Sequence, residues 1–413
     1  MITEQELYVF IDGLARKFEN RPHVPDANGD PPDSEGWGQF LDGPPLQTQI
    51  GPYGTCSGLI VRALAGRGHD QLAEHVGKLL SHWWAQRKTK EEERKLFSQT
   101  TRVAMLLLAL RVAQLQSTDA VLKEVTEYLL STLRPDKMWG NYTTPGVVED
   151  PSPRLFPTAI ALMAFSLFRK DGSDLPADFV LCTEKLEDRL LGAKDLPALH
   201  VAAAAAAILA VKNGNASKKI RKQIKKWAYA TQPTLPELGV YFYDLDFIKD
   251  DGKHEYHRDY FIIPTEILIG IAGFQKGAPT YLRLRAESSL NALVKNLRGF
   301  DGYYRPDNEQ RVSSVNQCWV AMYLALAREN FSAGPGWYSR FMFALLRQRS
   351  DTFWTDAILL GGSLAGILLA GLTDFPVLSA RSLIIKALAA SLAFIAGRFY
   401  APPFLRKVFV GRE

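Results

Sequence analysis

The densest group of side chains able to do chemistry lies in one stretch, YFYDLDFIKDDGKHEYHRDY, which runs from Tyr241 to Tyr260. Asp244 and Asp246 are two positions apart, and a carboxylic acid with a second carboxylate beside it can act as a proton donor. We therefore take these two aspartates as the candidates for a catalytic acid. The stretch predicts a long loop, and long ordered loops are often functional.

The same stretch also carries residue types that bind metals and small molecules. His254 and His257 have an HxxH spacing, but no glutamate stands where the HExxH zinc motif places one. We therefore expect no metal, and we interpret the stretch as a loop that lines or covers a ligand site. A structural insertion is the alternative. Its candidate ligand-binding residues are His257, Arg258 and Asp259.

A second group of polar side chains stands at or near the starts of apolar segments that predict helices. Helix N-termini carry unpaired N–H groups and a partial positive charge, so several of them meeting at one place favour an anion. We predict an anionic small-molecule ligand there; the alternative is that these residues cap helices and tie neighbouring repeats together. The candidate ligand-binding residues of this group are Tyr53, Cys56, Arg102, Arg154, His200, Arg305 and Asn316.

The segments that must position these residues follow two alternating helical patterns. One pattern is charged and amphipathic, typical of a helix that covers a core; its members are Glu4–Phe18, Gln71–Arg87, Ala120–Leu133, Ala177–Leu191, Ser217–Ala230, Tyr281–Leu297 and Trp337–Arg347. The other is rich in alanine and leucine and nearly uncharged, typical of a buried helix; its members are Ser57–Leu64, Thr100–Ala113, Pro157–Phe168, Pro197–Val211, Ile263–Phe274 and Ser314–Ala327. The alternation predicts a closed ring of inner helices wrapped by outer ones, with an open solenoid as the alternative.

A turn that combines glycine with aromatic residues precedes some of the apolar helices. It reads GFDGYYRP before SSVNQCWVAMYLALA, and MWGNYTTP before LFPTAIALMAF; we expect a matching turn at Gly51-Pro52-Tyr53-Gly54. This pattern resembles the repeats of the terpenoid cyclase and protein prenyltransferase superfamily. The resemblance implies an all-α fold, an (α/α)6 toroid built as a double barrel, over about residues 1–347.

The catalytic motifs of that superfamily are not matched. Aligned on Trp319, Ser313 and Val315 stand where the resemblance would place two zinc ligands of a prenyltransferase. In YDLDF, Phe247 stands where the DxDD motif of a cyclase has its next aspartate. We therefore expect no cofactor, and the sequence favours a binding protein over an enzyme without excluding either.

Charge and cysteine content narrow the class of protein further. Forty-nine basic and 44 acidic side chains give a formal net charge of +5, and no basic stretch alternates with aromatic residues that would stack on bases, so we expect no nucleic-acid partner. The three cysteines are far apart and form no CxxC pair, which favours reduced thiols and a cytosolic body. Cys56 lacks a recognisable histidine partner, and a small buried residue is the simpler interpretation.

Two apolar runs near the C-terminus predict a transmembrane helical hairpin. They are AILLGGSLAGILLAGL from Ala357 and ALAASLAFIAG from Ala387, and flanking aromatic residues bring each close to spanning length. Small residues four apart allow close helix approach and a homo-oligomer through the hairpin; they are Gly362, Gly366, Ala389 and Ala393. The alternative is a hairpin buried in the protein's own fold.

These observations predict two domains, a toroid over residues 1–350 and the membrane hairpin with a short tail over residues 351–413. Basic residues flank both ends of the hairpin, so the positive-inside rule places the toroid on the cytoplasmic side of the inner membrane. We expect a protein anchored in the lipid bilayer that binds a ligand or partner and acts through the hairpin, as a bacterial defence effector would. The alternative is a membrane-bound enzyme like a terpenoid cyclase or prenyltransferase, acting on an isoprenoid or lipid-derived substrate.

Overall fold

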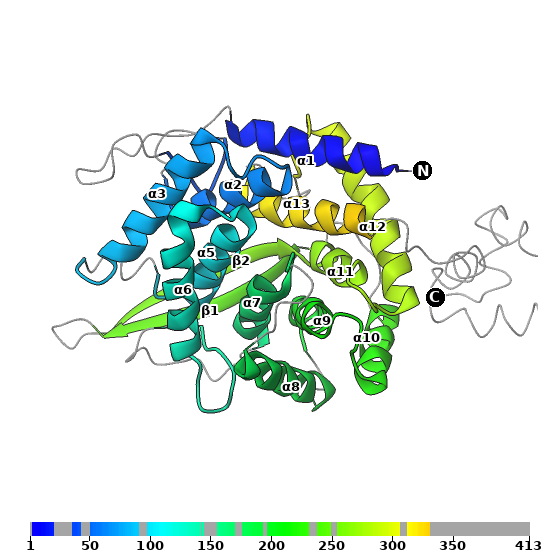
Figure 1. The fold of residues 1–413 in the computed structure, drawn as a ribbon. Coiled ribbons are helices and arrows are strands. Elements are labelled where there is room, and N and C mark those ends of the chain that lie inside the picture. Colours follow the sequence, from blue (N-terminus) through cyan, green and yellow to red (C-terminus); the bar gives the residue numbers. More distant parts are fainter. Residues whose placement is uncertain are drawn as a thin grey trace, which may run out of the picture. The chain divides into compact units, whose positions relative to one another are not determined.

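The computed structural model in Figure 1 describes most of the first four-fifths of the chain. The described residues are 2–19, 35–42, 50–90, 97–141, 143, 155–169, 176–192, 196–230, 238–248, 254–305 and 312–330. They belong to one compact unit, Met1–Pro335, and Gly336–Glu413 forms a second unit. The predicted domain boundary at residue 350, the helix Trp337–Arg347 and the predicted membrane hairpin lie outside the described residues.

Six inner helices form a closed ring. In chain order they are α2 (Pro52–Leu64), α5 (Thr100–Ala113), α7 (Leu155–Ser166), α9 (Ala198–Lys212), α11 (Thr265–Gly273) and α13 (Ser314–Glu329). Each packs against the next, and α13 returns to pack against α2. Almost every residue of α7, α9 and α11 is buried, as expected for helices that are apolar all round. The ring is therefore an (α/α)6 toroid, as the sequence predicts.

In the part of the chain that the structure describes, six outer helices surround the ring and alternate with the inner helices along the chain. They are α1 (Glu4–Glu19), α3 (Gln71–Gln86), α6 (Asp119–Ser131), α8 (Ala177–Gly192), α10 (Lys218–Ala230) and α12 (Thr280–Gly299), and a short 3-10 turn, η2 (Gln116–Thr118), precedes α6. Each buries one stripe: in α1 the stripe is Leu7, Ile11, Leu14 and Phe18, at the spacing of one helix face. Asp70 caps α3 by accepting a hydrogen bond from the Ala73 N–H at 2.9 Å.

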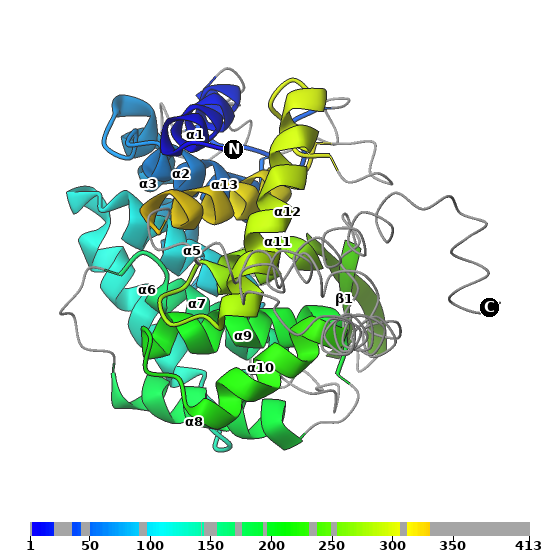
Figure 2. The same ribbon diagram turned by 90° about the vertical axis from the view of Figure 1, so that its right-hand side faces the viewer.

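Among the described residues, one β-hairpin interrupts the helical pattern, in the stretch for which the sequence predicts a loop. Strands β1 (Leu238–Ile248) and β2 (His254–Pro264) pair antiparallel over their whole length. Strand β1 contacts α9, and β2 contacts α11 and α13. Because β2 leads directly into α11, the hairpin lies at the end of the ring where the inner helices begin, as Figure 2 shows. We call this end the N-terminal end and the opposite one the C-terminal end.

The aromatic turns that precede three inner helices are fixed by the same reciprocal hydrogen bonds. The Trp139 N–H donates to Thr158 Oγ1 at 3.0 Å, and the same hydroxyl donates to the Trp139 carbonyl at 3.3 Å. Trp37 and Thr55 form the equivalent pair at 3.3 Å, and Tyr304 and Gln317 form it at 2.8 Å. The polar partner is each time the fourth residue of the following helix.

This pattern corrects the position of the first turn. Gly51 is the residue before α2, and Pro52–Gly54 already form the first turn of that helix. The equivalent of the other turns is centred on Trp37, whose indole ring lies over Gly58 so closely that a Cβ there would be 2.3 Å from the ring. Proline at the first position of a helix resembles a turn in sequence, which explains the misplacement.

The ring closes through the segment around residues 38–42. Ser314 donates its N–H to the Gln39 carbonyl at 2.9 Å and its hydroxyl to the Gly38 carbonyl at 2.6 Å. Asp42 accepts the Val312 N–H at 2.6 Å and pairs with Arg305 at 3.0 Å. These bonds join the first repeat to the last, so closure does not depend on apolar packing alone.

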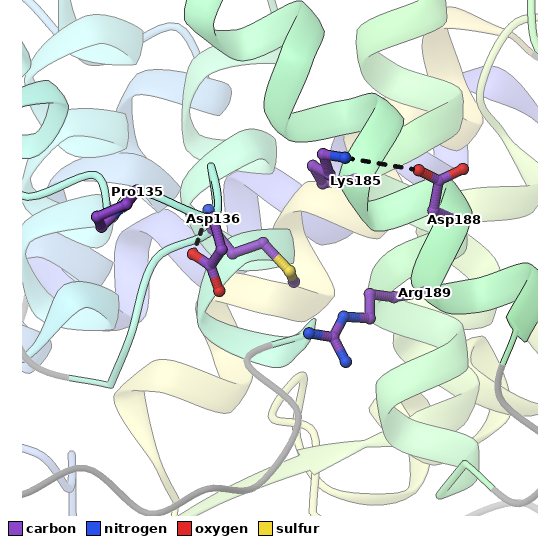
Figure 3. A pocket seen from close by; sticks show the side chains of 6 residues that line it. Pro135, Asp136, Lys185, Asp188 and Arg189 are labelled. Carbon is purple, nitrogen blue, oxygen red and sulfur yellow. Dashed lines mark hydrogen bonds and ion pairs between the residues drawn. The ribbon is translucent and has the colours of Figure 1, made fainter.

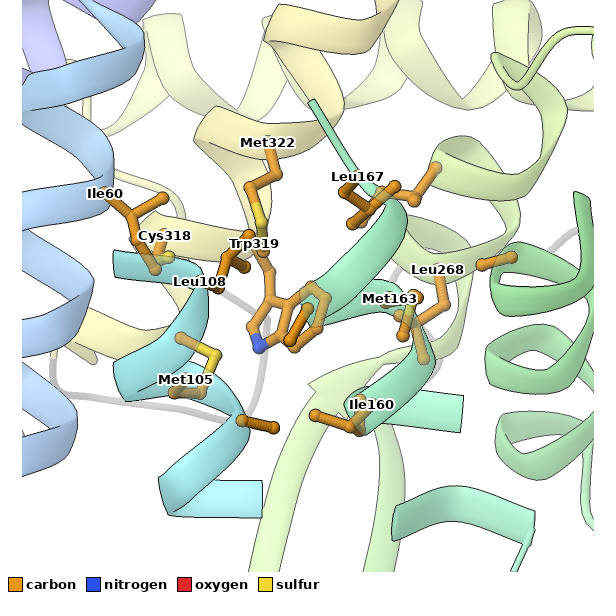
Figure 4. Close-up of a cluster of buried hydrophobic side chains, with 14 of the residues drawn as sticks. Ile60, Met105, Leu108, Ile160, Met163, Leu167, Leu268, Cys318, Trp319 and Met322 are labelled. Atoms are coloured by element: carbon orange, nitrogen blue, oxygen red, sulfur yellow. The ribbon is translucent and has the colours of Figure 1, made fainter. Parts of the chain in front are cut away.

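The middle of the ring is filled by side chains from facing inner helices, as Figure 4 shows. Trp319 of α13 lies at its centre, with Met105 of α5 and Ile160 of α7 around it. All three are at most 3% exposed. The ring is therefore a packed core, and a ligand is expected at its ends.

No helix in the described part of the chain is both long enough and apolar enough to cross a bilayer.

Candidate functional site

The N-terminal end of the ring brings together one cluster of the predicted site residues. The Tyr53 hydroxyl lies 2.7 Å from Thr101 Oγ1 and donates to Gln99 Oε1 at 3.4 Å. The Arg102 guanidinium lies over the Tyr53 ring, 5.1 Å from its centroid. Tyr53 comes from α2 and the other three from the start of α5, so the cluster joins two neighbouring repeats. We call these four residues the Tyr53 cluster.

His200 lies near the same end, in the first turn of α9. Its ring centroid is 6.1 Å from that of Phe156 of α7, and the side chain is only 8% exposed. Burial disfavours the charged imidazolium and lowers the pKa of His200 to about 4. A histidine with that pKa is neutral at physiological pH, so it can offer one donor and one acceptor but no charge.

Cys56 and Asn316 are buried in the seam between α2 and α13. Burial raises the pKa of the Cys56 thiol, and the neighbouring Cys318 raises it further. The thiol therefore stays protonated, which is the opposite of what a nucleophile needs. Asn316 is 1% exposed, and its N–H donates to the Ser313 side chain at 3.3 Å in the first turn of α13. Both positions fit a structural role better than contact with a ligand.

Arg305 lies at the same end of the ring, but its partners are outside the Tyr53 cluster. Its guanidinium pairs with Asp42, and its backbone N–H donates to Asn296 Oδ1 at 3.1 Å. Because Asp42 belongs to the closing segment, Arg305 helps to join the two ends of the chain. Arg154 lies outside the described residues, as do the hairpin positions Gly362, Gly366, Ala389 and Ala393.

The remaining predicted residues lie on the β-hairpin, where the structure describes the backbone. The register places Asp244 opposite Arg258, Leu245 opposite His257, and Asp246 opposite Tyr256. Asp259 lies opposite Tyr243. The aspartates and the basic residues are thus neighbours across two paired strands, at the same end of the ring as the Tyr53 cluster.

A pocket of about 470 Å³ lies on the outer rim of the N-terminal end, between the connection from α6 to α7 and the last turns of α8 (Figure 3). Lys185 pairs with Asp188 at 4.0 Å, and Asp136 accepts the Met138 N–H at 3.2 Å. Arg189 forms no ion pair within the described part of the chain. It extends toward the pocket in Figure 3. The pocket offers carboxylates and a cation around the Met138 side chain.

Two residues of this end and one at the centre of the ring were not among the predicted site residues. Gln99 and Thr101 complete the Tyr53 cluster, but their contact joins residues 46 and 48 positions apart, which no local pattern indicates. Trp319 carries a buried Nε1–H without a hydrogen-bond partner among the described residues. In the sequence, Trp319 serves only as the point on which the family repeat is aligned, and no pattern marks its Nε1–H.

The comparisons with known proteins concern the fold. The sequence matches no protein-family model, and no curated protein matches it. The structure is similar to an inactive variant, with two adjacent aspartates changed to asparagine, of the α-1,6-mannanase GH76A of Salegentibacter sp. HEL1_6 in complex with α-1,6-mannotriose. The TM-score is 0.51 at 13% identity, and the match covers 78% of this chain and 99% of the mannanase.

Two further structures match less well. They are the GH76A α-1,6-mannanase itself, with a TM-score of 0.48 at 12% identity, and the glycoside hydrolase family 76 mannosidase Bt3792 from Bacteroides thetaiotaomicron VPI-5482, with a TM-score of 0.42 at 9% identity. Each match covers 78% of this chain and nearly all of the other. The likeness is one of fold.

These findings correct the predicted function. The predictions of a membrane effector and of a terpenoid cyclase or prenyltransferase were wrong, because the similar structures are glycoside hydrolases and no described helix can span a membrane. The physical reason for the second error is visible in Figure 4: Trp319 and its neighbours occupy the space in which an isoprenoid substrate would have to be enclosed. The resemblance to that superfamily holds for the toroid architecture alone.

Proposed function

We propose that this chain binds a glycan at the N-terminal end of its ring. The observation that carries the proposal is the match of the inner and outer helices to 99% of a mannanase whose structure holds a mannotriose. Because the centre of the ring is packed, the glycan lies across the ends of the inner helices, beside the β-hairpin.

The chemistry of the N-terminal end supports a neutral, hydroxyl-rich ligand. The Tyr53 cluster offers a phenol, an alcohol and an amide in one hydrogen-bonded group, with a guanidinium over the phenol ring. His200 is neutral, and the rim pocket adds Asp136 and Asp188. Sugar hydroxyls both donate and accept hydrogen bonds, so a mixture of neutral and charged partners suits them.

A binding experiment with the full chain tests this proposal. We expect α-1,6-linked mannotriose or another neutral oligosaccharide to bind in isothermal titration calorimetry. Tyr53→Phe and Arg102→Gln should each weaken binding by about tenfold, the effect of losing one good hydrogen bond. Arg221→Gln on outer helix α10 is the matched control and should bind normally. If no neutral oligosaccharide binds, or if Tyr53→Phe and Arg102→Gln bind like the wild type, the proposal is wrong.

Hydrolysis of the bound glycan is a second candidate function, favoured by the hairpin carboxylates. Glycosidases use two carboxyl groups, one to protonate the leaving oxygen and one to attack or to activate water, about 5–9.5 Å apart. Asp244 and Asp246 are two residues apart in β1, a rise of about 6.7 Å along the strand. The mannanase is inactive without two adjacent aspartates, and this sequence has one such pair, Asp250–Asp251, between β1 and β2.

The two pairs can be told apart by double substitution. We expect release of reducing sugar from a bound oligosaccharide, and its loss in either Asp244→Asn/Asp246→Asn or Asp250→Asn/Asp251→Asn, with glycan binding kept. The pair whose loss abolishes release is the catalytic one. Binding without any release of reducing sugar by the wild type would exclude hydrolysis of that glycan and leave the binding proposal standing.

A further inference from the structure

Two arginines at the C-terminal end of the ring have an unusual set of contacts. Arg111, in the last turn of α5, donates its two terminal guanidinium nitrogens to the Phe165 and Leu167 carbonyls at the end of α7. Those carbonyls belong to a helix C-terminus, where no N–H of the helix can pair with them. The contact therefore satisfies the end of α7, but it uses only part of the Arg111 guanidinium.

The rest of the Arg111 guanidinium and part of Arg169 are buried without an acceptor. Arg111 Nε and Arg169 Nη1 have no hydrogen-bond partner among the described residues, and neither atom is accessible to solvent. Neither guanidinium forms an ion pair with a carboxylate in the part of the chain that the structure describes. A buried donor attached to a charged group is costly to leave unpaired, so these two N–H groups point to an acceptor that the described residues do not provide.

The two positive charges also act on each other. Burial, and to a smaller extent the nearby Arg169, lowers the pKa of Arg111 to about 10. The other arginine buried at this end of an inner helix is arranged differently: Arg62 of α2 pairs with both Glu19 and Asp70. Within the described ranges, Arg111 and Arg169 are thus a pair of like charges without a carboxylate partner such as Arg62 has.

We propose that Arg111 and Arg169 bind a phosphate group, either inorganic phosphate or a phosphate monoester. A phosphate monoester carries a charge of about −1.5 to −2 at pH 7, which balances two guanidinium groups, whereas a single carboxylate would leave one of them uncompensated. Its several oxygens can accept from Arg111 Nε and Arg169 Nη1 together. This site lies at the opposite end of the ring from the proposed glycan site and does not depend on it.

Thermal unfolding of the full chain at constant ionic strength tests the proposal. We expect inorganic phosphate, and in a parallel arm mannose 6-phosphate, to raise the Tm by about 2–4 °C over sodium chloride. A larger shift with mannose 6-phosphate would identify an ester as the ligand, and equal or smaller shifts would identify the free anion. Arg169→Gln should remove the shift, and titration calorimetry should show phosphate affinity reduced at least tenfold.

Two controls separate binding from a purely structural role. Arg221 lies in the basic outer helix α10, and Arg221→Gln should keep the full rise of the Tm in phosphate. If Arg221→Gln lost this rise, phosphate would be attracted to basic residues in general, and the proposal would be overturned. Without phosphate, Arg169→Gln should be at least as stable as the wild type, because it removes a like charge beside Arg111. An unchanged Tm of the wild type in phosphate, or a Tm loss in Arg169→Gln without phosphate, would contradict the proposed site.

Discussion

The two ends of the ring are held together by different interactions. At the N-terminal end, neutral groups form short reciprocal bonds between repeats, as between Trp139 and Thr158. At the C-terminal end, cations lie in the last turns of inner helices: Arg62 pairs with Glu19 and Asp70, and Arg111 bonds to carbonyls of α7. Each arrangement suits the helix dipole, because positive side chains stabilise C-termini and would oppose N-termini.

The difference indicates where each kind of ligand can bind. Paired hydrogen bonds fix the turns of the N-terminal end, and Arg305 there is balanced by Asp42, which suits recognition of an uncharged ligand. Cations at helix C-termini leave positive charge wherever a carboxylate is missing, as beside Arg111. We therefore expect stability at the N-terminal end to depend on packing and pairing, and at the C-terminal end on charge.

The largest effect is expected from removing the aromatic anchor of an N-terminal turn. Trp139 is fully buried, its Nε1–H donates to the Leu129 carbonyl at 2.8 Å, and its ring lies 5.6 Å from that of Phe179. Trp139→Ala should lower the free energy of unfolding by about 3–5 kcal/mol, measured by urea denaturation. Phe300→Ala, at a side chain that is 43% exposed, should change little. Comparable losses in the two variants would show that the turn is not an anchor.

A smaller effect, dependent on pH, is expected at His200. Its pKa is lowered from 6.5 to about 4, so the unfolded chain takes up a proton at a higher pH than the folded one. The contribution of neutral His200 to the free energy of unfolding is therefore complete above pH 6.5 and is lost as the pH falls from 6.5 to about 4. At 1.36 kcal/mol per pKa unit, the loss reaches at most about 3 kcal/mol.

Denaturation at a series of pH values measures this effect. In His200→Gln the fall in stability between pH 6.5 and 4 should be smaller than in the wild type by that amount. His69→Gln, at an exposed histidine, serves as the control and should follow the wild type. If wild type and His200→Gln lose stability in parallel, His200 is not the buried neutral group that the structure indicates.

Much of the toroid could be predicted from periodicity, whereas contacts between distant segments could not. The sequence predicts Thr100–Ala113 with the bounds that α5 has, because a long run of mostly apolar residues is typical of a buried helix. The β-hairpin lies where the sequence predicts a loop, because its strands lack a regular alternation of polarity and strand pairing is not visible in one sequence. The Tyr53 cluster and the pair of Arg111 with Arg169 join residues more than 45 positions apart, and the family resemblance suggested the wrong chemistry.

At the C-terminal end, removal of Arg62 tests how much an ion pair contributes. Arg62 is 1% exposed, but the side chains of Glu19 and Asp70 are 28% and 42% exposed and can be hydrated when it is lost. Arg62→Met should therefore cost about 2 kcal/mol, less than the 3–5 kcal/mol expected for a fully buried pair. Added salt should reduce the difference in free energy of unfolding between Arg62→Met and the wild type. Arg16→Met, at an exposed arginine of α1, is the control; an equal cost there would remove the contrast between buried and surface cations.

The smallest effect is expected from one methyl-for-hydroxyl exchange at an N-terminal turn. Thr158→Val keeps the shape of the side chain but leaves the buried Trp139 N–H and carbonyl without their partner, which should cost about 1–2 kcal/mol. Thr126→Val is the matched control, because the Thr126 hydroxyl donates only to the Leu122 carbonyl of its own helix at 2.7 Å. Thr158→Ser should recover most of the loss, since it restores the hydroxyl. If both valine variants lose the same stability, the reciprocal bond contributes no more than an ordinary helix contact, and the N-terminal end is held by packing alone.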